Sequence, residues 1–189
     1  MRIVGGTLRG RRLASLGKGD EAARLRPTSD RVRESLFNML MSAHGDVVAG
    51  AHVLDLFAGT GALGLEALSR GAGRAVFVEN GRKALAVLRE NIALCEVRER
   101  AQVLARDARR PGKTPDGVFD LVFLDPPYGK GLGEAALQAA QAGGWLADDA
   151  LIVWEEGRAI TPPAGMHLLD QRRYGDTVIS ILRRQAAPA

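Results

Sequence analysis

Residues 52–64 read HVLDLFAGTGALG, an apolar run that passes into a loop with three closely spaced glycines. The aliphatic residues at 52–57 predict a buried strand, and the residues after the loop predict an amphipathic helix. Gly59, Gly61 and Gly64 fit the pattern G-x-G-x-x-G, in which small residues let backbone N–H groups approach a ligand at the start of a helix. This order of strand, glycine-rich turn and helix predicts a nucleotide-binding α/β fold.

The rest of the chain continues the alternation of strands and helices. Further strands are expected at 75–79, 101–105, 119–124 and 150–155, and helices at 62–70, 82–94 and 133–142. Such alternation favours a parallel, doubly wound sheet. Two strands at 166–174 and 177–183 flank Gly175 and Asp176, a two-residue connection typical of an antiparallel hairpin. We therefore expect a Rossmann-like α/β fold whose seven-stranded, mostly parallel sheet ends in a C-terminal antiparallel hairpin.

Two acidic residues lie in the first two expected strands, Asp55 within the first and Glu79 at the end of the second. Glu79 ends the second strand about 20 residues after the first glycine, where a carboxylate can accept hydrogen bonds from both hydroxyls of a ribose. A nicotinamide-dependent dehydrogenase would fit these features equally well. However, Asp55 lies four residues before Gly59, where a carboxylate would repel a pyrophosphate and attract the cationic part of S-adenosylmethionine. This position, together with the antiparallel end of the sheet, favours a methyltransferase.

A second motif, Asp125-Pro-Pro-Tyr128, follows the apolar strand at 119–124. Two consecutive prolines fix φ and remove two backbone donors, which leaves a stiff loop of acceptors. The carboxylate of Asp125, the carbonyl of Pro126 and the ring of Tyr128 suit an exocyclic amine on a planar base. Asp and Pro are also common in ordinary turns, so the motif has weight mainly because the glycine-rich loop accompanies it.

Together, Asp-x-Phe-x-Gly-x-Gly at 55–61 and the motif at 125–128 resemble those of class I S-adenosylmethionine-dependent methyltransferases that modify amino groups. The resemblance extends to MRIVGGTLRGRRL at 1–13, LRPTSDRVRESLFNML at 25–40, ALGLEALSR at 62–70 and GWLA at 144–147, which are similar to the bacterial 16S rRNA guanine-N2 methyltransferases of the RsmD type. It covers almost the whole chain. It implies transfer of a methyl group from S-adenosylmethionine to the N2 of a guanine in small-subunit rRNA, within a partly or fully assembled ribosomal subunit.

The same resemblance assigns the site residues. Asp55 is expected near the methionine amino group and Glu79 at the ribose, and the complete expected cofactor set is Asp55, Phe57, Ala58, Gly59, Gly61, Glu79, Asn80, Asp107 and Ala108. The expected catalytic set is Asp125, Pro126, Pro127 and Tyr128, with the tyrosine stacked on the base. Asp107 could also be a simple turn cap. Thr28 and Arg31 are expected to face cofactor or RNA.

The first position of the catalytic motif bears on the identity of the base. Guanine presents two adjacent donors on its pairing edge, whereas adenine presents an acceptor beside its amine. An ionised carboxylate can only accept hydrogen bonds, whereas a carboxamide can both accept and donate them. Asp125 therefore matches guanine better than adenine as long as it is ionised, since a protonated acid could also donate.

Positive charge is concentrated at the N-terminus. Residues 1–33 contain nine Arg or Lys against three Asp or Glu, a net charge of +6, whereas the whole chain has +4. Eight of the nine are arginines, whose planar guanidinium suits phosphate recognition. A solvated, merely solubilising surface is the alternative. We expect a basic RNA-binding extension over residues 1–45 before a methyltransferase domain over 46–189, with RNA contacts from Arg9, Arg11, Arg12, Arg24, Arg26, Arg31 and Arg33.

The composition predicts a cytoplasmic enzyme. A chain of 189 residues with 46% hydrophobic content can bury one core, its single cysteine argues against disulfides, and no apolar run is long enough to span a membrane. The N-terminus lacks a signal-peptide pattern. The three histidines lack metal-ligand spacing, so we expect no metal, and a monomer is the default.

Three other functions compete with this interpretation. The nearest is an amino-methyltransferase acting on adenine N6 or cytosine N4 of DNA. A small-molecule methyltransferase is disfavoured by the basic N-terminus. A non-catalytic rRNA-binding assembly factor is disfavoured by the intact motifs at 55–61 and 125–128.

Overall fold

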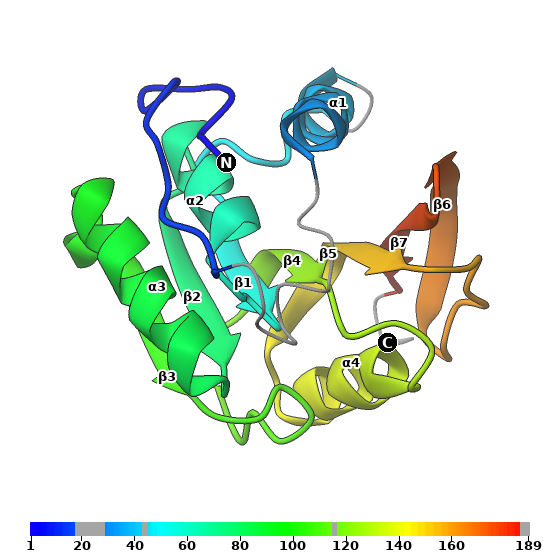
Figure 1. Cartoon of the computed structure of the whole chain (residues 1–189). Helices are drawn as coiled ribbons and strands as arrows, with labels where there is room; N and C mark the ends of the chain where they lie inside the picture. The colour runs from blue at the N-terminus through cyan, green and yellow to red at the C-terminus, as the bar shows by residue number, and fades with distance from the viewer. Residues whose placement is uncertain (18–28, 43–44, 115–116, 186–189) are drawn as a thin grey trace.

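The computed structural model of the chain describes residues 1–17, 29–42, 45–114 and 117–185 (Figure 1). Within these residues the elements follow the order α1 (Asp30–Ser42), β1 (His52–Leu56), α2 (Ala62–Ser69), β2 (Arg74–Glu79), α3 (Arg82–Leu94), the 3₁₀ turn η2 (Arg98–Arg100), β3 (Ala101–Ala105), β4 (Phe119–Leu124), α4 (Leu132–Ala142), β5 (Leu146–Glu156), β6 (Met166–Tyr174) and β7 (Thr177–Arg184).

The seven strands form one sheet in the order β3-β2-β1-β4-β5-β7-β6. The pairs among β1 to β5 are parallel, whereas β7 runs antiparallel to both β5 and β6. The predicted fold class and its C-terminal hairpin are thus confirmed. Several expected boundaries differ by one residue, and one differs by more, because β5 begins at Leu146 rather than at residue 150; the register of β5 against β4 shifts between Phe119 and Leu121.

Two apolar cores lie on opposite faces of the sheet, because strand side chains alternate between the faces. On one face, Val53, Phe77 and Phe123 pack against residues of α1, α2 and α3. On the other face, α4 covers the sheet, and Trp145 and Trp154 are fully buried there. Figure 1 shows α4 on the side of the sheet opposite α2 and α3. Both tryptophans are therefore core residues.

The first residues form a compact loop that packs into the core. Arg2 and Arg12 form an antiparallel bridge, and Ile3 N donates to the carbonyl of Arg11 at 3.0 Å. Ile3 and Leu13 are buried with residues of α1 and α2. The described part of the expected extension therefore shares its core with the sheet, and the division at residue 45 stays a proposal.

The topology brings the two sequence motifs together. β1 lies inside the sheet between β2 and β4, so the chain winds from β1 first toward one edge and later toward the other. Leu56 pairs with Leu124, so the loops that follow β1 and β4 leave the sheet side by side. In open α/β sheets, this switch point beyond the carboxyl ends of the strands is where ligands bind.

Candidate active site

The loop after β1 adopts a backbone that only certain residues tolerate. Gly59 and Gly61 have φ of 56° and 80°, in the left-handed region, and Phe57 is there as well with φ of 59°. A Cβ on Gly61 would lie 2.4 Å from Cδ1 of Leu88 on α3, so this residue must be glycine for a second reason. A non-glycine residue held in this region marks stored strain, which is frequent at ligand sites. The loop is thus preformed around residues 57–61.

Asp55 lies beneath the first turn of α2. Its side chain is buried, and its Oδ2 accepts a hydrogen bond of 3.0 Å from the backbone N of Gly64. Burial, with a smaller contribution from the charge of Glu79, raises the pKa of Asp55 to about 8. Burial removes the water that would stabilise the ionised form of this carboxylate. A cation bound beside it would replace that stabilisation, so the site favours a positively charged ligand.

Glu79 connects the loop after β1 to the turn after β2. Its Oε2 accepts from Gly59 N at 2.9 Å, and its Oε1 accepts from the amides of Asn80 at 2.9 Å and Gly81 at 2.7 Å. Each carboxylate oxygen has two lone-pair directions, so these bonds orient the group and leave it able to accept more. Asn80 beside it is exposed.

Asp107 caps its own turn after β3. Its Oδ1 accepts from the backbone N of Arg109 at 2.9 Å, and its carboxylate pairs with the guanidinium of that residue at 2.5 Å. The hydrogen bonds from Arg109 lower the pKa of Asp107. The alternative role as a turn cap is thus present in the structure, and the expected contact with adenine stays a proposal. The neighbouring Ala108 is buried in the core below α4.

Asp125 begins the loop after β4, next to the loop after β1. Its backbone N lies 3.4 Å from the carbonyl of Leu56, and its side chain is partly buried. Burial raises the pKa of Asp125 well above its usual range, and the charges of Glu155, Asp55 and Glu156 raise it further. The two predicted acids therefore lie within electrostatic reach of each other. Pro126 is buried, and Pro127 is partly exposed.

Tyr128 is fixed by contacts at both ends. Its hydroxyl donates to Oε1 of Glu155 at 2.8 Å and lies 3.0 Å from Oγ1 of Thr177 at the start of β7. A Cβ on Gly157 would lie 3.0 Å from its ring. Burial raises the pKa of the Tyr128 hydroxyl above its usual value, so it stays protonated as a donor. The C-terminal hairpin thereby helps to orient a predicted catalytic residue.

Two acids at the end of β5 were missed in the sequence. Glu155 and Glu156 are buried, and Oε1 of Glu156 accepts from the amides of Gly129 at 3.0 Å and Gly157 at 2.8 Å. It thus joins the loop after β4 to the loop after β5. The signal that could have found both was their place at the carboxyl end of a strand, where Asp55 and Asp125 were found.

This arrangement suits a cationic ligand. Carboxylates from β1, β4 and β5 gather around one end of the sheet, where the charges of Glu155, Asp55 and Glu156 raise the pKa of Asp125, so this end disfavours phosphate. The strained glycine loop offers open space, since a Cβ on Gly59 would meet only the Phe57 carbonyl, at 3.9 Å. These residues fit S-adenosylmethionine, whose ammonium and sulfonium groups are cationic. No cluster of ligating side chains that could hold a metal ion occurs among the described residues.

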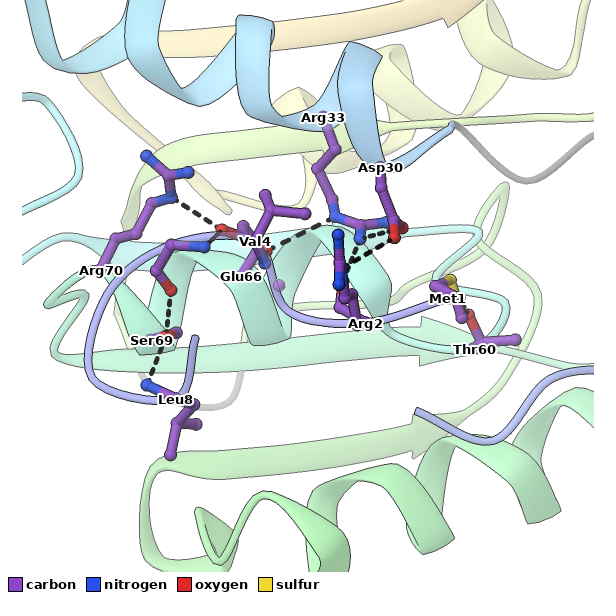
Figure 2. A network of polar contacts seen from close by, with 12 residues as sticks. Met1, Arg2, Val4, Leu8, Asp30, Arg33, Thr60, Glu66, Ser69 and Arg70 are labelled. Carbon is purple, nitrogen blue, oxygen red and sulfur yellow. Dashed lines mark hydrogen bonds and ion pairs between the residues drawn. The ribbon is translucent and has the colours of Figure 1, made fainter. Parts of the chain in front are cut away.

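A buried ion network anchors the N-terminal loop to α2 (Figure 2). Glu66 is fully buried; it accepts from the amides of Val4 at 2.9 Å and Gly5 at 2.8 Å, and it pairs with Arg70 at 2.8 Å and with Arg33 at 3.5 Å. The predicted RNA contact of Arg33 is therefore wrong. Its side chain has no exposed area, and its guanidinium binds Asp30, Glu66 and the carbonyl of Arg2.

The other predicted RNA-binding arginines differ in exposure. Arg9, Arg12 and Arg31 are exposed. Arg11 lies against the end of α3, where it binds the Leu94 carbonyl and pairs with Glu96 at 3.0 Å. Arg24, Arg26 and Thr28 lie outside the described residues.

Comparison with known proteins identifies the family. A family model described as "Conserved hypothetical protein 95" matches residues 1–183. The chain is 39% identical over 189 residues to ribosomal RNA small subunit methyltransferase D of Escherichia coli, covering 98% of this chain and 91% of that protein. The chain belongs to this methyltransferase family. The enzyme of the same name from Haemophilus influenzae is 36% identical over 182 residues, covering 93% and 89% of the two chains.

A solved structure agrees with this assignment. The Escherichia coli protein yhhF superimposes with a TM-score of 0.83 at 39% identity, covering 99% of both chains. The predicted family, the class I methyltransferase fold and the assignment as a methyltransferase are therefore confirmed. No helix in the described part of the chain has the length and apolar character needed to cross a bilayer.

Proposed function

We propose that this chain transfers a methyl group from S-adenosylmethionine to the exocyclic N2 of a guanine in small-subunit (16S) rRNA. The observation that carries the proposal is the neighbouring placement of the strained loop after β1 and the Asp125–Tyr128 loop after β4, in a chain of this family. The first loop is suited to a cofactor and the second to a base.

The cofactor would be held by the acids and backbone groups at the ends of β1, β2 and β3. Asp55 would face its cationic methionine part, Glu79 would accept from the ribose hydroxyls, and the backbone of residues 57–61 would lie along its chain. Asn80, Asp107 and Ala108 would surround the adenine. When bound, S-adenosylmethionine supplies an electrophilic methyl group on a sulfonium.

The residues of the β4 loop would prepare the base. The N2 lone pair of guanine is delocalised into the ring, so attack requires acceptors that hold its amino hydrogens. Asp125 and the Pro126 carbonyl would orient N2 and stabilise the positive charge that develops on it. A cation beside Asp55 and Asp125 also favours the ionised carboxylate, which only accepts and therefore matches the two donors of guanine.

Tyr128 would support the base from one side. Stacking on an aromatic ring contributes about 1 to 3 kcal/mol, and a paired base must first leave its helix. The hydrogen bonds that the Tyr128 hydroxyl makes with Glu155 and Thr177 hold the ring without consuming the acceptors of Asp125. Its rigid ring would thus define the plane in which the guanine lies.

RNA would be recognised through its phosphates by exposed arginines of the N-terminal part, of which Arg9, Arg12 and Arg31 are described. We further propose that the substrate is a partly or fully assembled small subunit, and that the chain acts as a cytoplasmic monomer. A DNA adenine or cytosine methyltransferase remains the nearest alternative.

Nucleoside analysis tests the proposal. Incubation with labelled S-adenosylmethionine and 16S rRNA, bare or in small-subunit particles, should give N2-methylguanosine. Label in N6-methyladenosine or N4-methylcytosine of DNA would favour the alternative. Absence of S-adenosylmethionine binding in calorimetry would favour a non-catalytic assembly factor.

A further inference from the structure

Asn91 of α3 has every polar contact of its side chain directed at two loops far away in the sequence. It is fully buried. Its Nδ2 donates to the carbonyl of Thr60 at 2.9 Å and to the carbonyl of Ala14 at 3.1 Å, and its Oδ1 accepts from the amide of Ala14 at 2.7 Å. A carboxamide has two N–H donors and one carbonyl acceptor, so all its groups are used.

The first of these loops is the one proposed to hold the cofactor. Thr60 lies between Gly59 and Gly61, whose left-handed φ values exclude the repeating hydrogen bonds of a helix or strand. Inside the loop, the N–H of the Thr60–Gly61 peptide donates to the carbonyl of Ala58 at 2.7 Å, and the carbonyl of that peptide faces out of the loop toward α3. Among the described residues, Asn91 provides a direct side-chain hydrogen bond to this carbonyl.

The second loop belongs to the N-terminal segment, residues 1–17, which carries the exposed Arg9 and Arg12. Ala14 is bound by Asn91 through both its N–H and its carbonyl. Met1 also meets the glycine loop, because the Thr60 hydroxyl lies 3.9 Å from its sulfur; Figure 2 shows the two side chains together. The segment is thus attached to the loop at both of its ends.

We propose that Asn91 is a positioning residue that couples RNA binding by the N-terminal segment to cofactor binding by the glycine loop. RNA bound to Arg9 and Arg12 holds residues 1–17 more firmly in place, and this restraint is transmitted through Ala14 and Asn91 to the Thr60 peptide, which keeps the preformed glycine loop in the conformation that binds the cofactor. The inference rests on the proposed function of both loops. Coupling of binding is reciprocal, so the cofactor strengthens RNA binding by the same factor.

The experiment compares S-adenosylmethionine affinity with and without a 16S rRNA transcript. In the natural protein, RNA should raise the affinity at least about fivefold, the lower end of usual coupling between sites. Asn91→Asp keeps the size of the side chain but replaces both N–H donors by an acceptor facing two carbonyls. It should weaken cofactor binding about tenfold, as expected for loss of one or two hydrogen bonds, and abolish the effect of RNA.

A neighbouring variant and a milder one separate coupling from folding. Glu90→Ala, an exposed change on the same helix, should keep both the affinity and the response to RNA. If Asn91→Asp does not fold, as judged by thermal unfolding, Ala14→Pro replaces it: this variant loses the N–H that donates to Asn91 but leaves the Thr60 contact. It should retain most cofactor affinity and lose the response to RNA.

Two outcomes would overturn the inference. Equal cofactor affinity with and without RNA in the natural protein would show that the loops are not coupled. A preserved response in folded Asn91→Asp, or in Ala14→Pro where that variant replaces it, would show that the coupling takes another route. If the natural protein bound no S-adenosylmethionine at all, the proposed function would fail first, and the coupling with it.

Discussion

The hydroxyl of Tyr128 donates a hydrogen bond of 2.8 Å to the buried carboxylate of Glu155, so the last residue of the β4 motif is fixed by the end of β5. A ring held in this way can meet a base without first losing conformational freedom. The strand that provides Glu155 also pairs with the C-terminal hairpin, which contributes Thr177 to the same hydroxyl.

Removing the ring should reduce catalysis more than removing the hydroxyl. Tyr128→Ala should lower kcat/KM by about five- to 150-fold, because stacking contributes about 1 to 3 kcal/mol. Tyr128→Phe keeps the ring, so its kcat/KM should fall by less than that of Tyr128→Ala. Steady-state kinetics on small-subunit particles measures both variants, and equal losses would mean that the hydroxyl rather than the ring matters.

Asp125→Ala should abolish methyl transfer, with a loss of at least about a hundredfold in kcat, because it removes an acceptor for the amino group that is attacked. Affinity for S-adenosylmethionine should change little, as measured by calorimetry. Asp125→Asn is the matched control for shape. A parallel loss of cofactor affinity and turnover in Asp125→Ala would contradict the division of roles between the two loops.

The free protein should become less stable as pH rises from about 4 to about 8. The folded-state pKa of Asp55 is about 8 against an ordinary value of 3.8, so the folded protein binds this proton more tightly than the unfolded chain does. Its free energy of unfolding, measured with urea, should therefore fall across this window. Asp55→Asn should flatten the profile.

Cofactor binding should show the opposite trend. A cation beside Asp55 favours the ionised carboxylate, so affinity for S-adenosylmethionine should rise with pH up to about 8, with release of a proton. S-adenosylhomocysteine, which lacks the sulfonium charge, serves as control and should respond less. Calorimetry in buffers of different ionisation enthalpy would reveal the proton, and uptake instead of release would contradict the assignment.

Arg9→Ala and Arg12→Ala should each reduce the salt dependence of RNA binding by about one unit of log–log slope, because each phosphate contact releases a counterion. Point changes are preferable to deletion of the segment, since Ile3 and Leu13 belong to the core. Arg98→Ala, an exposed change at the amino end of β3, is the control. An unchanged slope in both variants would show that Arg9 and Arg12 do not contact the RNA phosphates.

Glu66→Ala should lower the free energy of unfolding by about 3 to 5 kcal/mol, because the buried guanidinium of Arg33 then loses one of the two carboxylates with which it pairs. Glu66→Gln keeps an acceptor for the Gly5 amide and should cost less. Denaturant unfolding measures both. A loss below about 1 kcal/mol would show that the network contributes little to stability.

The sequence allowed prediction of the sheet and of both loops because these features are local. Alternating strands and helices fix a parallel order, and the carboxyl ends of strands identify Asp55 and Asp125 as neighbours once β1 and β4 are adjacent. The strained φ of Phe57 had no such signal, because it follows from the fit of the loop between β1 and α2.

Buried polar residues on helices could not be predicted in the same way. Arg33, Glu66 and Asn91 each occupy a position that a helical pattern would assign equally well to solvent. Their burial depends on partners about 30 to 80 residues away, such as Val4 for Glu66 and Ala14 for Asn91. Counting Arg33 as surface charge was the natural error, because charged residues are rarely buried unless they are paired.

Mapping of the methylated nucleotide tests the central claim most directly. Small-subunit particles from cells that lack this activity would be incubated with labelled S-adenosylmethionine and either the natural protein or Asp125→Ala. The account predicts a single N2-methylguanosine in 16S rRNA with the natural protein and none with the variant. Methylation at another atom or base, or equal labelling by Asp125→Ala, would contradict it.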